Sequence, residues 1–350
     1  MKPINFVVVG FGGMGSYHAR GLIGENQFVT TYGTYDSDEK RQAAAKEEGF
    51  KVYESFEAVL ADDNVEAILV ATPNDSHKQL VIDALRAGKH VVCEKPVMMS
   101  VADFDEVVNV AEEAGKVFMT HQNRRWDSDF LIIRDLYKSE EIGSLFQIES
   151  RVHGANGIPG DWRHLKAQGG GMLLDWGVHL LDQLLFMVDS PIKSVSADLS
   201  FVLGDDADDG FMSYIIFENG VRAHIEVGTS NFIKLPRWYV KGYQGTGVIN
   251  DWDLSGELVL QRETDVKHEP TPIQAGQGLT KTMAPPSEEM TECRELPSVT
   301  AEFDSFYDNF YQVVREGAEA VVKNPEVRDC LVLIETIFKA AETGETIKMN

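Results

Sequence analysis

Cysteine is scarce in this chain: Cys93, Cys293 and Cys330 are the three among 350 residues. An odd number without any C-x-x-C spacing argues against a disulfide framework and against a zinc site. No set of His, Asp and Glu residues has the spacing of metal ligands either, so the sequence predicts no metal.

Basic residues are also in short supply, with 32 Lys and Arg against 56 Asp and Glu and a net charge of −24. A surface this acidic repels phosphate backbones and anionic lipids, which excludes nucleic acid and membrane surfaces as partners. No apolar run reaches the length of about 20 residues that spans a bilayer. The first residues lack a signal-peptide profile, so we expect a cytoplasmic protein.

What the chain does have is an apolar run, residues 4–9, that leads directly into a glycine-rich turn with the spacing G-x-G-x-x-G. In this pattern the first glycine permits a tight turn, the second lets the backbone approach a pyrophosphate, and the third lets the next helix pack closely. A helix from about Ser16 would point its free N–H groups at the phosphates. The turn therefore predicts a dinucleotide site that includes Gly10, Phe11, Gly12, Gly13, Met14 and Gly15.

Asp36 lies 21 residues beyond Gly15, at the end of a second strand-like run, residues 28–35. A carboxylate there would bind the ribose hydroxyls of the cofactor and repel a 2′-phosphate. The prediction is NAD rather than NADP. Because Lys40 and Arg41 lie nearby and would offset part of that repulsion, NADP remains possible.

Residues 1–122 alternate short apolar runs with helical periodicity. This alternation predicts a parallel, doubly wound α/β sheet, the Rossmann type, as the first domain. Further strands are expected at 65–71, 90–93 and 117–120, and helices at 38–48, 55–61, 76–87 and 101–114.

Ligands bind at the carboxyl ends of the strands in such a sheet. The residues that follow two of the predicted strands therefore become cofactor-binding candidates: Thr72, Pro73, Asn74, His77, Glu94 and Lys95. The segment that follows a third strand, 121–126, is a further candidate for ligand binding. The ammonium of Lys95 would project toward the nicotinamide, where it would bind a substrate hydroxyl and stabilise a developing alkoxide. By position alone, a surface ion pair between Lys95 and Glu94 is equally consistent.

Residues 123–350 predict a second domain of α+β type with an open, mostly antiparallel sheet, because consecutive strands are joined by tight turns. Strands are expected at 146–153, 192–203, 212–217, 222–228, 238–242 and 258–262, with turns at 218–220 and 244–247. A proline-rich stretch without clear periodicity, 263–297, predicts a long loop. Further helices are expected at 127–138, 301–316 and 327–343.

One more helix is predicted from the run Gly169-Gly170-Gly171 to about Met187. It carries Asp175 and His179 at positions i and i+4, on one helical face. Asp175 would orient the imidazole and hold up its pKa, which makes His179 a candidate general acid/base. Spacing alone favours a plain local ion pair, worth about 0.3 kcal/mol. The apolar neighbours, however, predict a buried helix in which an unpaired acid and imidazole would be costly.

Aromatic and basic side chains supply candidates for a sugar-binding wall and its hydrogen-bond donors. They are Arg125, Trp126, Trp162 and Arg163. Each of them taken alone is as consistent with a structural role.

Taken together, these motifs resemble the Gfo/Idh/MocA family of oxidoreductases over essentially the whole chain. The resemblance lies in the turn 10–15, the run Ala71–His77, Glu94-Lys95-Pro96 and the helix with Asp175 and His179. It implies a Rossmann domain followed by a domain whose open sheet forms a dimer or tetramer interface. It further implies that Lys95, Asp175 and His179 are the catalytic set and bind substrate, and that the Lys95–Pro96 bond is cis.

The activity that the resemblance implies is NAD-dependent, reversible oxidation of a secondary hydroxyl on a sugar, glycoside or cyclic polyol. His179 would remove the hydroxyl proton while Lys95 stabilises the oxygen. Three alternatives stay open: a glycosidase that recycles its NAD, a glycoside-oxidising enzyme that acts before a separate lyase, and a non-catalytic NAD(H) sensor. The presence of Lys95, Asp175 and His179 argues against the sensor.

Overall fold

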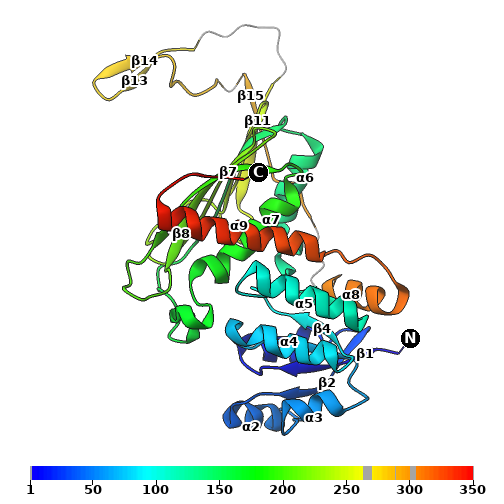
Figure 1. Cartoon of the computed structure of the whole chain (residues 1–350). Helices are drawn as coiled ribbons and strands as arrows, with labels where there is room; N and C mark the ends of the chain where they lie inside the picture. Colours follow the sequence, from blue (N-terminus) through cyan, green and yellow to red (C-terminus); the bar gives the residue numbers. More distant parts are fainter. Residues whose placement is uncertain (1, 263–269, 288, 300–304, 350) are drawn as a thin grey trace.

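The structure is a computed structural model that describes residues 2–262, 270–287, 289–299 and 305–349. Two sheets organise the chain (Figure 1). Within the described ranges, no helix is long and apolar enough to cross a membrane.

The first sheet has five parallel strands in the order β2-β1-β3-β4-β5. They are β1 (Ile4–Val9), β2 (Val29–Tyr35), β3 (Ala67–Val70), β4 (His90–Cys93) and β5 (Phe118–Thr120). The helices of this part are α1 (Gly13–Tyr17), α2 (Glu39–Glu47), α3 (Phe56–Ala61), α4 (His77–Arg86) and α5 (Val101–Ala114). Every residue of β3 is buried, as expected for a strand covered on both faces. The predicted Rossmann architecture is confirmed.

The second sheet has nine strands in the order β15-β12-β11-β10-β6-β9-β8-β7-β16, and all of its pairs are antiparallel except β6–β9. They are β6 (Leu145–His153), β7 (Ile192–Ser200), β8 (Gly210–Phe217), β9 (Arg222–Gly228), β10 (Trp238–Gly242), β11 (Gly245–Ile249), β12 (Gly256–Gln261), β15 (Thr291–Arg294) and β16 (Ile347–Lys348). The predicted open, mostly antiparallel sheet is therefore confirmed.

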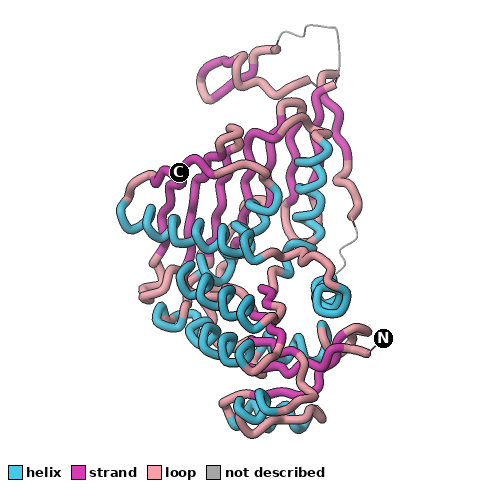
Figure 2. Tube along the Cα trace, turned by 45° about the vertical axis from the view of Figure 1, so that its right-hand side comes forward, coloured by secondary structure: helices cyan, strands magenta, loops and turns pink. Residues whose placement is uncertain are grey.

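Helices α6 (Ser128–Ser139), α7 (Val178–Met187) and α9 (Asn324–Thr343) lie on one side of this sheet (Figure 2). Helix α9 packs against α7 and β7 and also reaches α5, so it ties the two parts of the molecule together. Helix α8 (Ser305–Glu316) packs back on the first sheet, where Tyr307 and Phe310 contact Phe6. The predicted second domain thus contributes a helix to the first.

Two predictions about the second sheet are wrong. The stretch 244–247, predicted as a turn, mostly belongs to β11, because pairing with β10 and β12 on both sides outweighs the low strand propensity of glycine. The stretch 263–297 is not simply a loop. It contains β15, paired with β12, and a hairpin of β13 (Ile273–Ala275) and β14 (Gly278–Thr280) that projects beyond the sheet (Figure 1). Residues 263–269, 288 and 301–304 lie outside the described residues.

Candidate active site

The glycine turn between β1 and α1 is closely packed. Gly10 has a φ of +95°, and a Cβ on Gly15 would lie 1.7 Å from the Gly10 carbonyl oxygen, so neither position accepts a side chain. Gly12 differs, since an added Cβ would meet only the Arg41 guanidinium at 3.4 Å. This cradle fits a dinucleotide, because its backbone can be approached at the central glycine.

The predicted helix after the turn is not regular. α1 ends at Tyr17 and continues as a π-helical turn, His18–Leu22. Turns of this kind often occur at functional sites. Here the turn carries a fully buried His18.

Asp36 lies beside the turn, as predicted, and is 5 % exposed. One carboxylate oxygen accepts the Phe11 main-chain N–H at 2.6 Å and the other accepts that of Asp38 at 2.8 Å. The Arg41 guanidinium lies 3.5 Å from the same carboxylate. Asp36, which would repel a 2′-phosphate, therefore lies beside Arg41, which would attract one.

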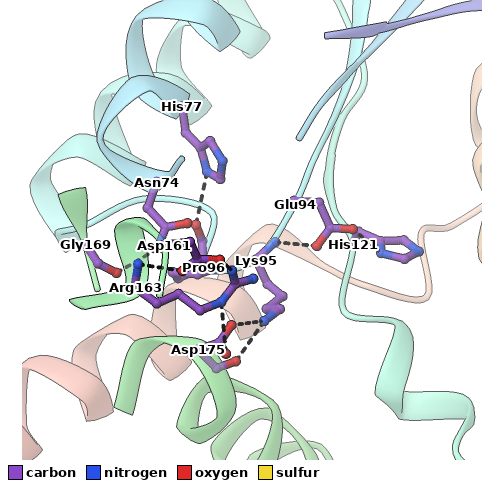
Figure 3. Close-up of polar contacts among 10 residues, drawn as sticks. All are labelled: Asn74, His77, Glu94, Lys95, Pro96, His121, Asp161, Arg163, Gly169 and Asp175. Atoms are coloured by element: carbon purple, nitrogen blue, oxygen red, sulfur yellow. Dashed lines mark hydrogen bonds and ion pairs between the residues drawn. The ribbon is translucent and has the colours of Figure 1, made fainter. Parts of the chain in front are cut away.

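Two side chains hold the loops that follow β3 and β4. The buried His77 ring contacts main-chain carbonyl oxygens only, with Nδ1 3.1 Å from that of Pro96 and Nε2 3.0 Å from that of Thr72. No ring nitrogen is left for the cofactor contact predicted for His77, so its side chain connects the two loops instead. The Asn74 amide donates to the Gly169 carbonyl at 2.8 Å and so joins the loop after β3 to the glycine run before Asp175 (Figure 3).

Lys95 points into the second domain. Its ammonium donates to the main-chain oxygen of Asp175 at 2.8 Å and to the Asp175 carboxylate at 3.0 Å (Figure 3). The Lys95–Pro96 bond is cis, as predicted. A surface ion pair between Lys95 and Glu94 is thereby ruled out, because the Glu94 carboxylate is buried and contacts two imidazoles instead.

Asp175 lies in a second π-helical turn, Leu173–Gly177, that precedes α7. Its carboxylate contacts Lys95 on one oxygen and the Arg163 guanidinium on the other, at 3.3 Å. Burial raises the pKa of Asp175, but Lys95 and Arg163 outweigh it and hold the pKa below its usual value. The predicted orientation of His179 by Asp175 is wrong, since the π turn places the acid against the two cations.

His179 is 5 % exposed, and its Nδ1 has no hydrogen-bond partner among the described residues. Burial lowers its pKa well below the usual value, and the charges of Lys95 and Arg124 act in the same direction. The expectation that an adjacent acid holds this pKa up is therefore wrong. At neutral pH the imidazole is neutral, which is the form a proton acceptor needs.

Arg124 is the arginine beside this site; the sequence indicated its segment, 121–126, but favoured Arg125 within it. Its guanidinium lies 4.4 Å from the Trp176 ring centre and 5.4 Å from that of Trp252. Trp176 in turn packs edge-on against His179. Arg125, the predicted substrate ligand, is buried in ion pairs with Asp182 and Glu326, which leaves it a structural role.

The other predicted wall residues divide in the same way. Trp162 lies under Arg163, whose guanidinium is 4.7 Å from its ring centre and also contacts the Asp175 carboxylate. Trp126 instead packs edge-on against Phe306 and lies, partly buried, against the hydrophobic core. Substrate contact by Trp126 has no support from this packing.

Comparison with known families agrees with the two-part fold. Residues 4–122 match the model described as "Oxidoreductase family, NAD-binding Rossmann fold", and residues 130–248 match the "GFO/IDH/MocA C-terminal domain". The chain belongs to the Gfo/Idh/MocA oxidoreductase family. The chain shares the NAD-binding fold of the family. Membership of the family does not distinguish NAD from NADP as the cofactor.

Three similar members of the family illustrate its range. The crystal structure of an NAD-binding protein from Listeria innocua is 60% identical, covers 100% of both chains and superposes with a TM-score of 0.97. The scyllo-inositol 2-dehydrogenase (NADP(+)) IolW of Bacillus subtilis is 25% identical over 86% of this chain and 83% of its own. The 1,5-anhydro-D-fructose reductase of Ensifer adhaerens is 34% identical over 60% of this chain and 65% of its own.

Proposed function

We propose that the protein is an NAD-dependent dehydrogenase for a secondary hydroxyl of a sugar, glycoside or cyclic polyol. The observation that carries the proposal is the convergence of three groups at the carboxyl end of β4. They are the Lys95 ammonium, the Asp175 carboxylate and the neutral His179 imidazole, and they come from the two parts of the molecule. The names of the inositol and anhydrofructose relatives support the same substrate class.

The cradle between Gly10 and Gly15, with Asp36 beside it, would hold the dinucleotide. A bound nicotinamide would supply the acceptor for the hydride that leaves the carbinol carbon. His179 removes the hydroxyl proton, and Lys95 stabilises the negative charge that develops on the oxygen. Asp175 and Arg163 bind a neighbouring hydroxyl, and Trp176 with Arg124 forms one wall of the substrate site.

A panel of sugars, inositols and glycosides, assayed for NADH formation, tests the proposal. We expect stoichiometric NADH from at least one polyol or sugar. Cleavage of a glycoside without net NADH would instead assign the recycling glycosidase reaction. NAD⁺ binding without any turnover across the panel would assign the sensor.

We also propose a cytoplasmic location. The three cysteines, Cys93, Cys293 and Cys330, are all free thiols in the structure. Free thiols persist in a reducing compartment, which supports this location.

Cofactor choice gives a first prediction. NAD⁺ should bind more tightly than NADP⁺ by a factor of ~10 or more, about 1.4 kcal/mol, because a 2′-phosphate would meet the Asp36 carboxylate. The substitution Asp36→Ala should narrow the difference. Arg41→Ala is the matched variant. It should weaken the binding of NADP⁺ and leave the affinity for NAD⁺ nearly unchanged. Calorimetric titration measures the affinities of the unmutated protein and the two variants for NAD⁺ and NADP⁺. Equal affinities of the unmutated protein for the two cofactors would contradict the prediction.

Assembly gives a second prediction. The side of the second sheet that the helices leave uncovered exposes Met212 and Tyr214 of β8, at 48 % and 43 %. Apolar side chains on the open face of a sheet are a typical contact surface, so we propose a homodimer or homotetramer through this face. Light scattering should give a multiple of 39.0 kDa. Tyr214→Glu combined with Met212→Glu should lower that mass and retain NAD⁺ binding. A single-chain mass for the unmutated protein at micromolar concentration would refute the assembly.

A further inference from the structure

Behind Lys95 lies a buried polar cluster that the reaction above does not use. Glu94 follows β4, His121 follows β5, and His18 lies in the π-helical turn after α1. One Glu94 oxygen, Oε1, lies 2.7 Å from His18 Nε2 and 2.9 Å from His121 Nδ1. Tyr307 of α8 adds a fourth group, with its hydroxyl 2.7 Å from His18 Nδ1. All four residues are at most 5 % exposed.

The hydrogen bonds of the cluster define where its protons lie. An ionised carboxylate only accepts, so His18 donates from Nε2 and His121 donates from Nδ1. The Tyr307 hydroxyl then donates to the free Nδ1 of His18 and fixes that tautomer. The second Glu94 oxygen accepts the main-chain N–H of Lys95 at 3.2 Å (Figure 3). In this scheme Glu94 carries the negative charge and His18 is neutral.

The surroundings keep that charge in place. Burial raises the pKa of Glu94, but His121 and His18 outweigh it and hold the pKa well below its usual value. Burial, with His121 beside it, lowers the pKa of His18, so His18 stays neutral. An ionised Glu94 beside a neutral His18 is thus the stable state at neutral pH.

The cluster also lies within electrostatic reach of the proposed base. Lys95 and Arg124 lower the pKa of His179, and His121 adds to this effect. Glu94 acts in the opposite direction and raises it. The buried charge therefore opposes the two cations that face the imidazole.

We propose that His18, Glu94 and His121 act as one positioning unit for the dehydrogenase reaction. The two imidazoles hold Glu94, and Glu94 holds the Lys95 main chain so that its ammonium reaches Asp175. The same unit places one fixed negative charge behind Lys95 and His179. This inference rests on the proposed function for its kinetic consequences, whereas the proton arrangement is a property of the chain itself.

A metal ion is the rival occupant, because the three ligand-type atoms lie within 4.8 Å of one another. Spacing along the chain did not predict this group. Both nitrogens, however, lie at ordinary hydrogen-bond distance from the same carboxylate oxygen, and each donor has an acceptor. A proton on each imidazole therefore satisfies the cluster without a cation.

The substitution Glu94→Gln tests the unit. Three N–H groups point at the carboxylate, and a glutamine has one acceptor oxygen and an NH₂ group that only donates. In at least one of the three contacts, an N–H group would therefore face the glutamine NH₂ group, and no hydrogen bond could form. We expect kcat to fall roughly 10–100-fold, as for other residues that orient a functional group, with the KM for NAD⁺ nearly unchanged. The acidic limb of the pH–rate profile should move to lower pH, because loss of the negative charge destabilises protonated His179.

Two substitutions of His121 provide a second test if Glu94→Gln prevents folding. The His121→Asn amide nitrogen can replace Nδ1 as the donor, whereas His121→Leu cannot. We expect the asparagine variant to retain most of the kcat and the leucine variant to lose it. Glu66→Gln is the matched control, since Glu66 pairs with Arg315 and Lys2 just before β3, at the opposite end of the strand from the site.

Imidazole ¹⁵N NMR of the unmutated protein tests the proton arrangement without a substrate. We expect His18 protonated at Nε2 alone and His121 protonated at Nδ1. A doubly protonated His18 ring, or a Glu94→Gln protein with unchanged kcat and acidic limb, would overturn the proposal. Stoichiometric metal in the purified protein, lost in Glu94→Gln, would also overturn it in favour of a metal site. If no substrate is found, the NMR result still decides the proton arrangement separately.

Discussion

Replacing His179 by alanine should lower kcat by roughly 10²–10⁴-fold, the usual contribution of a positioned general base. His179 lies in α7, away from the glycine turn, so the affinity for NAD⁺ should stay nearly unchanged. The buried Nδ1 has no partner among the described residues, so removal of the ring costs no hydrogen bond at that nitrogen. Steady-state kinetics with calorimetric NAD⁺ binding separates lost chemistry from a damaged cofactor site.

The pH dependence makes this prediction specific. Oxidation requires the neutral imidazole, so the rate should rise with pH as His179 loses its proton. Burial, Lys95 and Arg124 hold the pKa of His179 well below 6.5. The rising limb should therefore lie in the acidic range and the rate should be level through neutral pH. His179→Ala should abolish the limb. If the limb survives in that variant, the proton acceptor is another group.

Those parts of the site that depend on one strand and its following loop could be predicted from the sequence. Gly10, Asp36 and Lys95 follow runs that form parallel strands, namely β1, β2 and β4. In a parallel sheet the carboxyl ends of such strands share one edge, so order along the chain is enough to place these residues together.

The parts that could not be predicted depend on contacts between distant segments. Arg124 and Arg125 are neighbours in a short 3₁₀ turn, yet one faces Trp176 and the other Asp182. Nothing in their local pattern distinguishes them. Trp252 reaches the site from the turn between β11 and β12, and that turn itself depends on a strand that the sequence did not indicate.

The two π-helical turns explain the remaining errors. A periodicity of 3.6 residues predicts that Asp175 faces His179, but the wider turn at Leu173–Gly177 directs the carboxylate to Lys95 and Arg163. The turn at His18–Leu22 likewise places His18 against Glu94, 76 residues away. Both deviations lie beside the proposed catalytic groups, which is where local rules are expected to fail.

Substitution of Lys95 is expected to have the second large effect on kcat. Lys95→Ala should lower kcat by roughly 10²–10³-fold, because the ammonium stabilises charge that develops only in the transition state. Its loss also leaves the Asp175 carboxylate, 16 % exposed, with Arg163 as its remaining cation. KM for the substrate should therefore change as well, since Asp175 is proposed to bind a neighbouring hydroxyl.

Lys95→Arg decides whether any positive charge is sufficient. The Lys95 ammonium makes two contacts with Asp175, one to the main-chain oxygen at 2.8 Å and one to the carboxylate at 3.0 Å. A planar guanidinium cannot reproduce both contacts from the same compact position, so arginine should not restore kcat. If Lys95 and His179 act on one proton transfer, the double variant should lose less than the product of the single losses. Losses that multiply fully would show that the two residues act in separate steps. An acidic limb that persists in His179→Ala and disappears in Lys95→Ala would identify Lys95 as the base.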